Sequence, residues 1–127
     1  DFPLIHRDKE YLKYCLSYIE QDLMPLGVKL NAKKTQIYPL KQGINFLGFK
    51  FRLTPTGKVI RLLSKNNIKN QKRKLRKFKK LVDEGKMTRK KVDECYASWR
   101  DHASKGNSYK LLQRMDAYYE ALWKGDI

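Results

Sequence analysis

The sequence has little cysteine and histidine, and each shortage excludes a class of protein. The two cysteines, Cys15 and Cys95, both fall within helical patterns, so we expect free, buried thiols in a reducing, cytoplasmic compartment and no disulfide framework. His6 and His102 stand alone, and no cysteine–histidine spacing typical of a metal site occurs. No apolar run is long enough to cross a bilayer, so we expect no membrane-spanning segment.

Acidic residues are also scarce. The 127 residues include 29 lysines and arginines but only 13 acids, which gives a net charge of +16. Charge of this size says little about fold, but it indicates an anionic partner, with nucleic acid ahead of an acidic membrane. Hydrophobic residues make up 41% of the chain, enough for one domain or two small lobes with a modest core.

The first half of the chain predicts an α+β arrangement. A short strand is expected over residues 2–6, followed by a helix that Asp8 caps and that Pro25 and Gly27 end. An apolar stripe runs along this helix: Leu12, Cys15, Leu16, Ile19 and Leu23. Brief strands are predicted at 28–30 and 35–38. A turn at 54–57 then leads into a returning strand at 58–62.

The stretch 43–51 organises this half. Ile44 and Phe46 share one face of an extended strand, whereas Leu47, Phe49 and Phe51 share a face of opposite phase. The phase slips beside Gly48, so we predict one strand running to about residue 53 with a bulge or bend at 47–48.

The second half predicts a three-helix bundle. Composition shifts at Ser64, and residues 65–91 hold thirteen lysines and arginines against two acids. Ser64, Thr88 and either Asn107 or Ser108 are candidate helix starts, and Gly85 and Gly106 are candidate ends. Short connections predict antiparallel neighbours. We therefore expect a small antiparallel strand group with one helix over 1–63, followed by a basic helical domain over 64–127.

Each expected helix of the bundle carries an apolar stripe. Most aromatic residues of the bundle follow these stripes and are expected in its core, with Tyr118 and Trp123 at least partly exposed. His102 is expected on a helix surface or at a cap.

Two segments resemble bacterial retroelement reverse transcriptases, of the group II intron-like and diversity-generating types. Residues 26–35, Leu-Gly-Val-Lys-Leu-Asn-Ala-Lys-Lys-Thr, resemble the segment that precedes the primer grip in that family. Residues 44–49, Ile-Asn-Phe-Leu-Gly-Phe, resemble the primer-grip strand itself. The resemblance implies the end of a polymerase palm, the primer grip and a helical thumb, with the remaining palm and fingers elsewhere in the parent chain.

The resemblance also implies roles for polar residues of the first half. Asp1 matches the second aspartate of the Tyr-x-Asp-Asp turn, which binds catalytic Mg²⁺ in the full-length enzyme, and the other metal-binding carboxylates are expected before residue 1. Lys34 matches a lysine near the incoming triphosphate that acts as a general acid, with Lys33 beside the nucleic acid; a solvated lysine pair in a turn remains an equal alternative. The parent is then an RNA-directed DNA polymerase, but this chain alone is predicted to be inactive and to bind no Mg²⁺ stably.

Two groups of residues are expected to contact an RNA template paired with a DNA primer. Phe46, Leu47 and Gly48 match the primer grip, which positions the primer end. The basic helix lacks interleaved acids, so its like charges repel one another unless a polyanion offsets them. Its expected phosphate contacts are Lys65, Lys69, Lys72, Arg73, Arg76, Lys77 and Lys80.

Two other function classes stay open. The main alternative is a stand-alone basic nucleic-acid-binding module, which the ordered matches at 26–35 and 44–49 disfavour. A protein that binds acidic membranes or proteins ranks lower, because the basic helix lacks the broad apolar face of membrane-surface helices.

Overall fold

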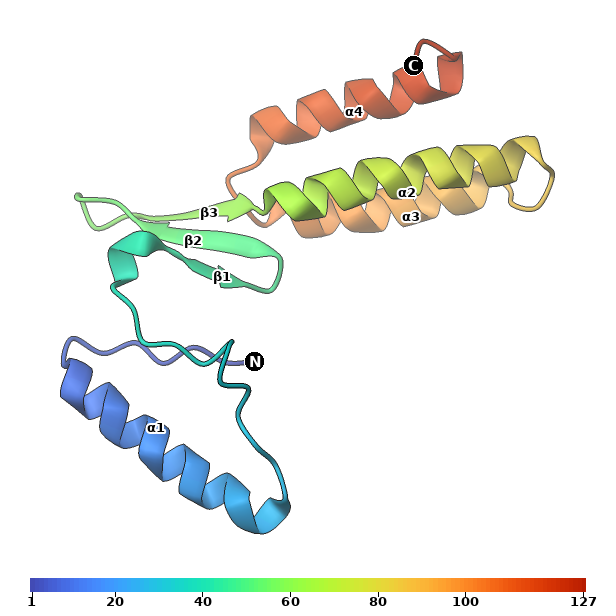
Figure 1. Cartoon of the computed structure of the whole chain (residues 1–127). Helices are drawn as coiled ribbons and strands as arrows, with labels where there is room; N and C mark the ends of the chain where they lie inside the picture. The colour runs from blue at the N-terminus through green and yellow to red at the C-terminus, as the bar shows by residue number, and fades with distance from the viewer. The chain divides into compact units, whose positions relative to one another are not determined.

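The computed structural model describes residues 1–127 and has the predicted α+β class, with four α-helices and one three-stranded antiparallel sheet. The chain forms two compact units, residues 1–39 and residues 40–127 (Figure 1). This division differs from the expected one between residues 63 and 64, because the sheet shares a hydrophobic core with the helices that follow it.

The first unit contains α1, Lys9–Leu23. Asp8 caps it as predicted, and its carboxylate accepts hydrogen bonds from the backbone N–H groups of Glu10 and Tyr11. The five residues of the predicted apolar stripe are the half-buried residues of this helix. A short 3-10 turn, η1 (Met24–Leu26), and Gly27 at φ 68° end it, as Pro25 and Gly27 predict.

The strands predicted at 2–6, 28–30 and 35–38 are wrong, because these segments form no regular structure. A strand needs a neighbour to satisfy its backbone N–H and C=O groups, and no segment of this chain pairs with them.

The second unit begins with a 3-10 turn, η2 (Leu40–Gln42), and a sheet of β1 (Ile44–Phe46), β2 (Phe49–Leu53) and β3 (Val59–Leu63). The strands lie in sequence order and pair antiparallel. The predicted turn at 54–57 joins β2 to β3, with the Gly57 N–H donating to the Thr54 carbonyl at 3.0 Å.

The single bulged strand predicted over 44–53 is wrong, since the chain reverses direction at Leu47 and Gly48. Phe46 pairs directly with Phe49, so these two residues are the ends of a two-residue hairpin turn. Leu47 has φ 51° and Gly48 has φ 82°, and positive φ at both central residues is the mark of a type I′ turn. Such a turn produces the same phase slip in the sequence as a bulge does.

The helices α2 (Lys65–Asp83), α3 (Arg89–Ser104) and α4 (Tyr109–Lys124) form the predicted bundle, in which they run alongside one another (Figure 1). Ser64 and Thr88 cap α2 and α3 through their hydroxyl groups, and α4 starts after Ser108. The core of the bundle consists of Leu75, Val92, Tyr96, Met115 and Leu122.

A second core joins the sheet to the bundle. Phe49 and Leu63 of the sheet pack against Ala103 of α3 and Leu112 of α4, and all four are at most 8% exposed. The sheet and the bundle are therefore parts of one folded unit. The predicted thiols are free, but Cys15 and Cys95 are half-buried where full burial was expected.

Candidate nucleic-acid interface

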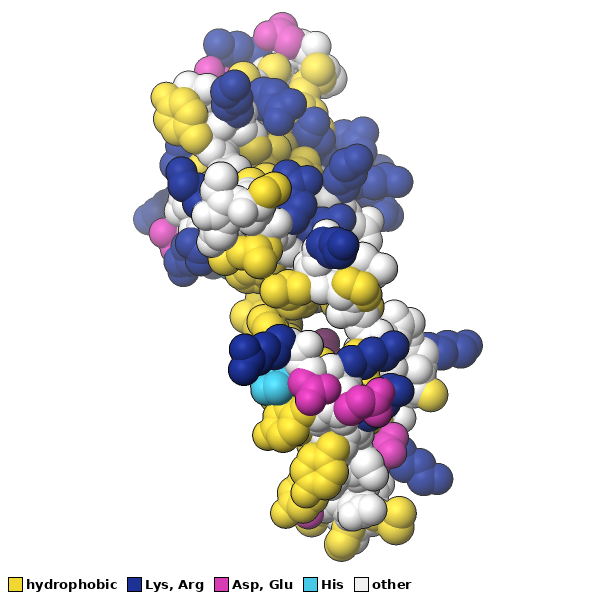
Figure 2. Space-filling model, turned by 90° about the vertical axis from the view of Figure 1, so that its left-hand side faces the viewer, with side chains coloured by type: hydrophobic (Ala, Val, Ile, Leu, Met, Phe, Trp, Pro, Cys, Tyr) yellow, Lys and Arg dark blue, Asp and Glu magenta, His cyan; other side chains and the backbone are white.

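Helix α2 carries most of the excess positive charge of the bundle. Its 19 residues include nine lysines and arginines and a single acid, Asp83. The apolar residues Ile68, Leu75, Phe78 and Val82 turn toward the core and leave the opposite face to cations. Figure 2 shows lysine and arginine side chains spread over the surface of the helical bundle.

Five exposed cations share that outer face, and we call them the α2 stripe: Lys69, Arg73, Arg76, Lys77 and Lys80. Four of them, Lys69, Arg73, Arg76 and Lys80, follow the i, i+4, i+7, i+11 spacing of one helix face. Lys65, also exposed, stands at the first position of the helix.

Most of the stripe has no acidic partner. Lys80 lies 4.0 Å from Glu84, at the limit of an ion pair, whereas Lys69, Arg73, Arg76 and Lys77 form no ion pair within the chain. On α3, by contrast, Arg89 pairs with Asp93 at 3.1 Å and Lys91 with Glu94 at 3.3 Å. The like charges of the stripe therefore repel one another without internal compensation.

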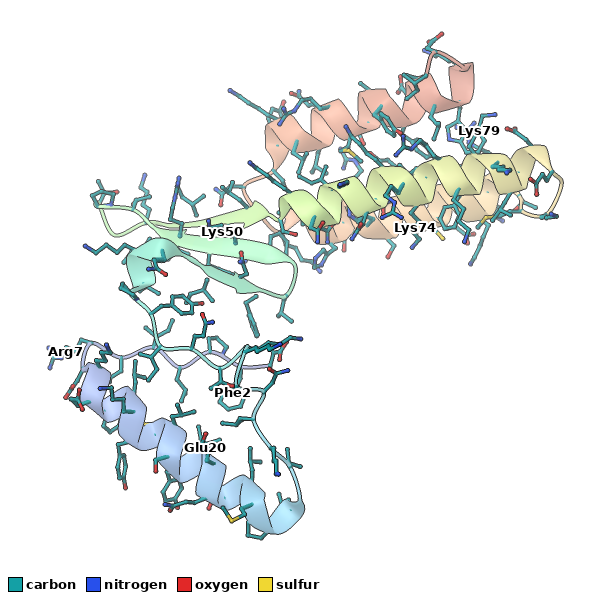
Figure 3. The ribbon with its side chains drawn as sticks, viewed as in Figure 1. Phe2, Arg7, Glu20, Lys50, Lys74 and Lys79 are labelled. Carbon is teal, nitrogen blue, oxygen red and sulfur yellow. The ribbon has the colours of Figure 1, made fainter.

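Lys72 differs from the other predicted phosphate contacts. Its side chain is half-buried, and its Nζ lies 4.9 Å from the centre of the Tyr118 ring of α4. Lys79, labelled in Figure 3 with Lys74 on α2, also turns toward α4, with its Nζ 2.7 Å from Asp83 and 5.6 Å from the centre of the Trp123 ring. These two lysines are engaged by aromatic rings on one flank of α2.

A polar network holds α3 against α4. The Arg100 guanidinium donates three hydrogen bonds of 2.9–3.1 Å to the Asp116 carboxylate, which also accepts one from the Tyr96 hydroxyl at 2.7 Å. The hydrogen bonds from Arg100, and then that from Tyr96, hold the pKa of Asp116 below its usual value. Burial first, and then the bond to Asp116, raises the pKa of Tyr96 far above its ordinary range.

The bundle aromatics are mainly packing residues, as predicted. Tyr96 stacks on Tyr119 with ring centres 4.3 Å apart and planes 8° apart. The Arg89 guanidinium lies 4.0 Å from the centre of the Trp123 ring. Tyr118 and Trp123 are half-buried, which confirms their partial exposure, while Tyr109 is 77% exposed and packs less than expected.

The predicted grip residues lie at the β1–β2 turn. Leu47 forms its tip and is 71% exposed, and Phe46 is half-buried in β1. Gly48 is exposed and lies against the bundle, because its carbonyl accepts a hydrogen bond of 3.0 Å from the Ser64 N–H.

Two residues that the sequence did not assign to a function flank this turn. A Cβ at Gly48 would stand 3.3 Å from Asn67 Nδ2 and 3.7 Å from His102 Nε2. His102 lies in the last turn of α3, in keeping with the expected helix-surface or cap position, but it is half-buried there, with its ring centre 5.0 Å from that of Phe49. Nothing local in the sequence indicates either contact.

The predicted catalytic residues belong to the first unit. Asp1, Lys33 and Lys34 are all exposed. The two lysines follow Asn31, whose side chain accepts from the Lys33 N–H at 3.0 Å and forms the expected turn. No group of three or more metal-ligating residues occurs in the structure, so Asp1 belongs to no such group.

Comparisons with known proteins return no match to any family model, curated protein or solved structure. None of the helices combines the length and the apolar character that a bilayer crossing requires.

Proposed function

We propose that this chain grips a template–primer duplex as part of an RNA-directed DNA polymerase, with the α2 stripe along the phosphates and the β1–β2 turn beside the primer. The observation that carries the proposal is the row of exposed cations on α2, most of which have no acidic partner. Contacts of this kind bind phosphates and position a duplex without reading its sequence.

The polymerase part of the proposal rests on the resemblance of residues 26–35 and 44–49 to the reverse transcriptase pattern. In that proposal the parent chain supplies fingers, the rest of the palm and the Mg²⁺-binding carboxylates, with Asp1 as one of them and Lys34 near the triphosphate. The chain by itself grips and does not polymerise, so nucleotide incorporation by the purified chain would contradict the assignment.

Salt dependence of duplex binding tests the role of the stripe. Five phosphate contacts predict a slope of log affinity against log salt of roughly −4 to −5. The variant R73Q/R76Q removes two of these cations, so we expect its slope to be shallower by about 2. The matched control is K90Q/R114Q, which removes the same charge from exposed, unpaired positions on α3 and α4.

Two outcomes overturn the role of the stripe. A slope near zero for the unaltered chain means that phosphates are not bound there. Equal losses in R73Q/R76Q and K90Q/R114Q mean that net charge, and not the stripe, attracts the duplex.

A stand-alone nucleic-acid-binding module is the second candidate, and the shared core of residues 40–127 favours it, since sheet and bundle form one unit. The form of the preferred duplex separates the two candidates. A polymerase thumb should prefer an RNA–DNA hybrid over B-form DNA at matched salt, because such duplexes are recognised by shape and 2′-hydroxyl groups. A general cationic module should bind both alike.

A further inference from the structure

The β1–β2 turn and the adjoining helices place two side-chain nitrogen atoms close to the Cα of Gly48, which carries no side chain. Gly48 is exposed, and the space where its side chain would stand is flanked by Asn67 Nδ2 at 3.3 Å and His102 Nε2 at 3.7 Å. We call Gly48, Asn67 and His102 the turn site. Since both nitrogens lie so close to one point, they are near enough to reach the oxygens of a single small anion.

The orientation of the Asn67 amide follows from its hydrogen bonds. Trp99 Nε1–H donates to Asn67 Oδ1 at 2.8 Å, and an indole nitrogen can only donate. The oxygen of the amide therefore faces Trp99, and the NH₂ group faces Gly48. That NH₂ group donates no hydrogen bond within the chain, so two donors of a half-buried side chain are free at the turn.

The His102 ring is also held in place. It packs on Phe49, itself only 6% exposed, and its ring nitrogens make no hydrogen bond within the chain. An imidazole in the Nε2–H tautomer, or protonated, presents a donor beside Gly48. Both donors are thus fixed by packing or hydrogen bonding before any ligand arrives, which lowers the entropic cost of binding.

The surroundings favour a negative charge. The Ser64 N–H donates to the Gly48 carbonyl, which brings the first turn of α2 beside the turn site. The partial positive charge at the N-terminus of a helix favours an anion there. Lys65 begins α2, and the α2 stripe starts one turn later at Lys69, so the turn site adjoins the row of cations proposed to follow the phosphates.

We propose that the turn site binds one backbone phosphodiester of the duplex, with Asn67 Nδ2–H and His102 Nε2–H donating to its oxygens as it rests on the Cα of Gly48. The inference rests on the proposed function and adds two binding residues to it. A neutral amide and an imidazole fix the position of one phosphate, whereas the flexible lysines of the stripe supply attraction along the strand.

The variant Asn67→Asp tests the turn site. An aspartate keeps an acceptor for Trp99 Nε1–H, but it replaces the NH₂ donor with an oxygen and adds a negative charge. The position lies in the first turn of α2, where acids are favourable, so the melting temperature should not fall. We expect affinity for an RNA–DNA hybrid duplex to fall about tenfold or more, because the variant loses a hydrogen bond to a charged group and adds a negative charge that repels the phosphate.

The matched control is Asn70→Asp, the same chemical change one turn along α2 at an exposed position. It should weaken binding by less than about threefold, since its carboxylate offsets part of the charge of the neighbouring Arg73 and Lys74 but removes no donor from the turn site. His102→Phe keeps a ring against Phe49 and removes the donor, so it should weaken binding about threefold to tenfold without the added charge. In the unaltered chain, the side-chain NH₂ signals of Asn67 should shift with added duplex but not with added NaCl.

Each result decides one question. If Asn67→Asp and Asn70→Asp lose affinity equally and the Asn67 NH₂ signals do not move, the turn site is wrong, while a loss in R73Q/R76Q still supports the stripe. If the unaltered chain binds no duplex, the proposed function and the turn site fail together. If Asn67→Asp unfolds the chain, the His102→Phe affinity and the Asn67 signals of the unaltered chain still decide.

Discussion

Asn107 pairs with Arg61 through two hydrogen bonds, as a residue of a neighbouring strand would. Its backbone N–H donates to the Arg61 carbonyl at 2.7 Å, and its side-chain Oδ1 accepts from the Arg61 N–H at 2.9 Å. A single residue between α3 and α4 thus covers part of the open edge of β3, where unpaired N–H and C=O groups would otherwise face solvent. This pairing holds the sheet to the bundle at a point outside their hydrophobic core.

Asn107→Ala removes the side-chain half of that pairing. We expect the free energy of unfolding to fall by about 1 kcal/mol, the usual contribution of one exposed hydrogen bond. Urea denaturation measures the change. Asn66→Ala is the control, because Asn66 is exposed and its side chain makes no hydrogen bond, so its effect should stay within about 0.5 kcal/mol. Equal effects would mean that the Arg61 contact adds nothing.

Gly106→Ala should destabilise the fold through a direct clash. A Cβ there would lie 2.8 Å from Phe49 Cε1 and 2.9 Å from the Arg61 carbonyl oxygen, so the backbone or a core ring must shift. We expect a loss of about 2–3 kcal/mol, typical of overpacking. Gly57→Ala is the comparison, since φ there is 84° with nothing within 4 Å of the added carbon, and backbone strain alone should cost about 1 kcal/mol. A larger loss at Gly57 would contradict the close packing at Gly106.

Leu47→Asn should make the chain more stable. Leu47 has φ 51°, an unfavourable backbone conformation for leucine, and its side chain is 71% exposed. Burial of the side chain therefore offsets little of the backbone strain. Asparagine before glycine is the preferred pair for a type I′ turn, and the expected gain is about 0.5–1 kcal/mol by thermal unfolding. Leu62→Asn, in the regular strand β3, should instead lower stability. A loss at both positions would mean that the exposed leucine packs more than its accessibility indicates.

Asp116→Asn should show the contribution of the ion pair with Arg100 as a loss of stability that depends on pH. The pKa of Asp116 is lowered in the folded chain, mainly by the Arg100 hydrogen bonds, so its ionised form stabilises the fold above the unfolded value of about 3.9. This stabilisation is lost as pH falls through the folded pKa. Urea unfolding should therefore show a deficit for the variant at pH 7 that shrinks below about pH 4. Glu120→Gln, at an exposed and unpaired position, should show little deficit at pH 7. A deficit for Asp116→Asn that is as large at pH 3 as at pH 7 would exclude the ion pair as its cause.

The helices could be predicted because their signals are local. The Ser64 and Thr88 hydroxyl groups each accept a hydrogen bond from a backbone N–H three residues ahead. Both partners of such a cap lie within four consecutive residues, so local sequence indicates it. The strands predicted at 2–6, 28–30 and 35–38 failed because a strand depends on a partner that local sequence does not specify.

The turn at Leu47–Gly48 shows a different limit. A slip in period-two alternation follows equally from a bulge and from a two-residue hairpin turn. What favours the turn lies elsewhere in the chain, including the bond from the Ser64 N–H and the packing of Phe49 on His102. The sequence located the irregularity but could not tell its kind.

The placement of the cations on α2 could be predicted in outline. The run of cations on α2 and its apolar stripe follow from helical spacing alone. The Lys72 side chain contacts the Tyr118 ring and does not join the exposed stripe, and this depends on how α4 packs beside α2. Asn67 and His102 lie 35 residues apart in the chain and meet at Gly48 only through tertiary structure, so no local pattern joins them.

The uncompensated cations of the α2 stripe give the chain two opposite responses to ionic strength. Added salt screens the repulsion among Lys69, Arg73, Arg76 and Lys77, so the folded chain should become harder to unfold as salt rises. The same screening weakens the attraction to a polyanion, and the released counterions no longer favour binding. On the proposed function, the conditions that best preserve the free protein are therefore those in which it binds nucleic acid least, and we predict that nucleic acid co-purifies with it from low-salt extracts.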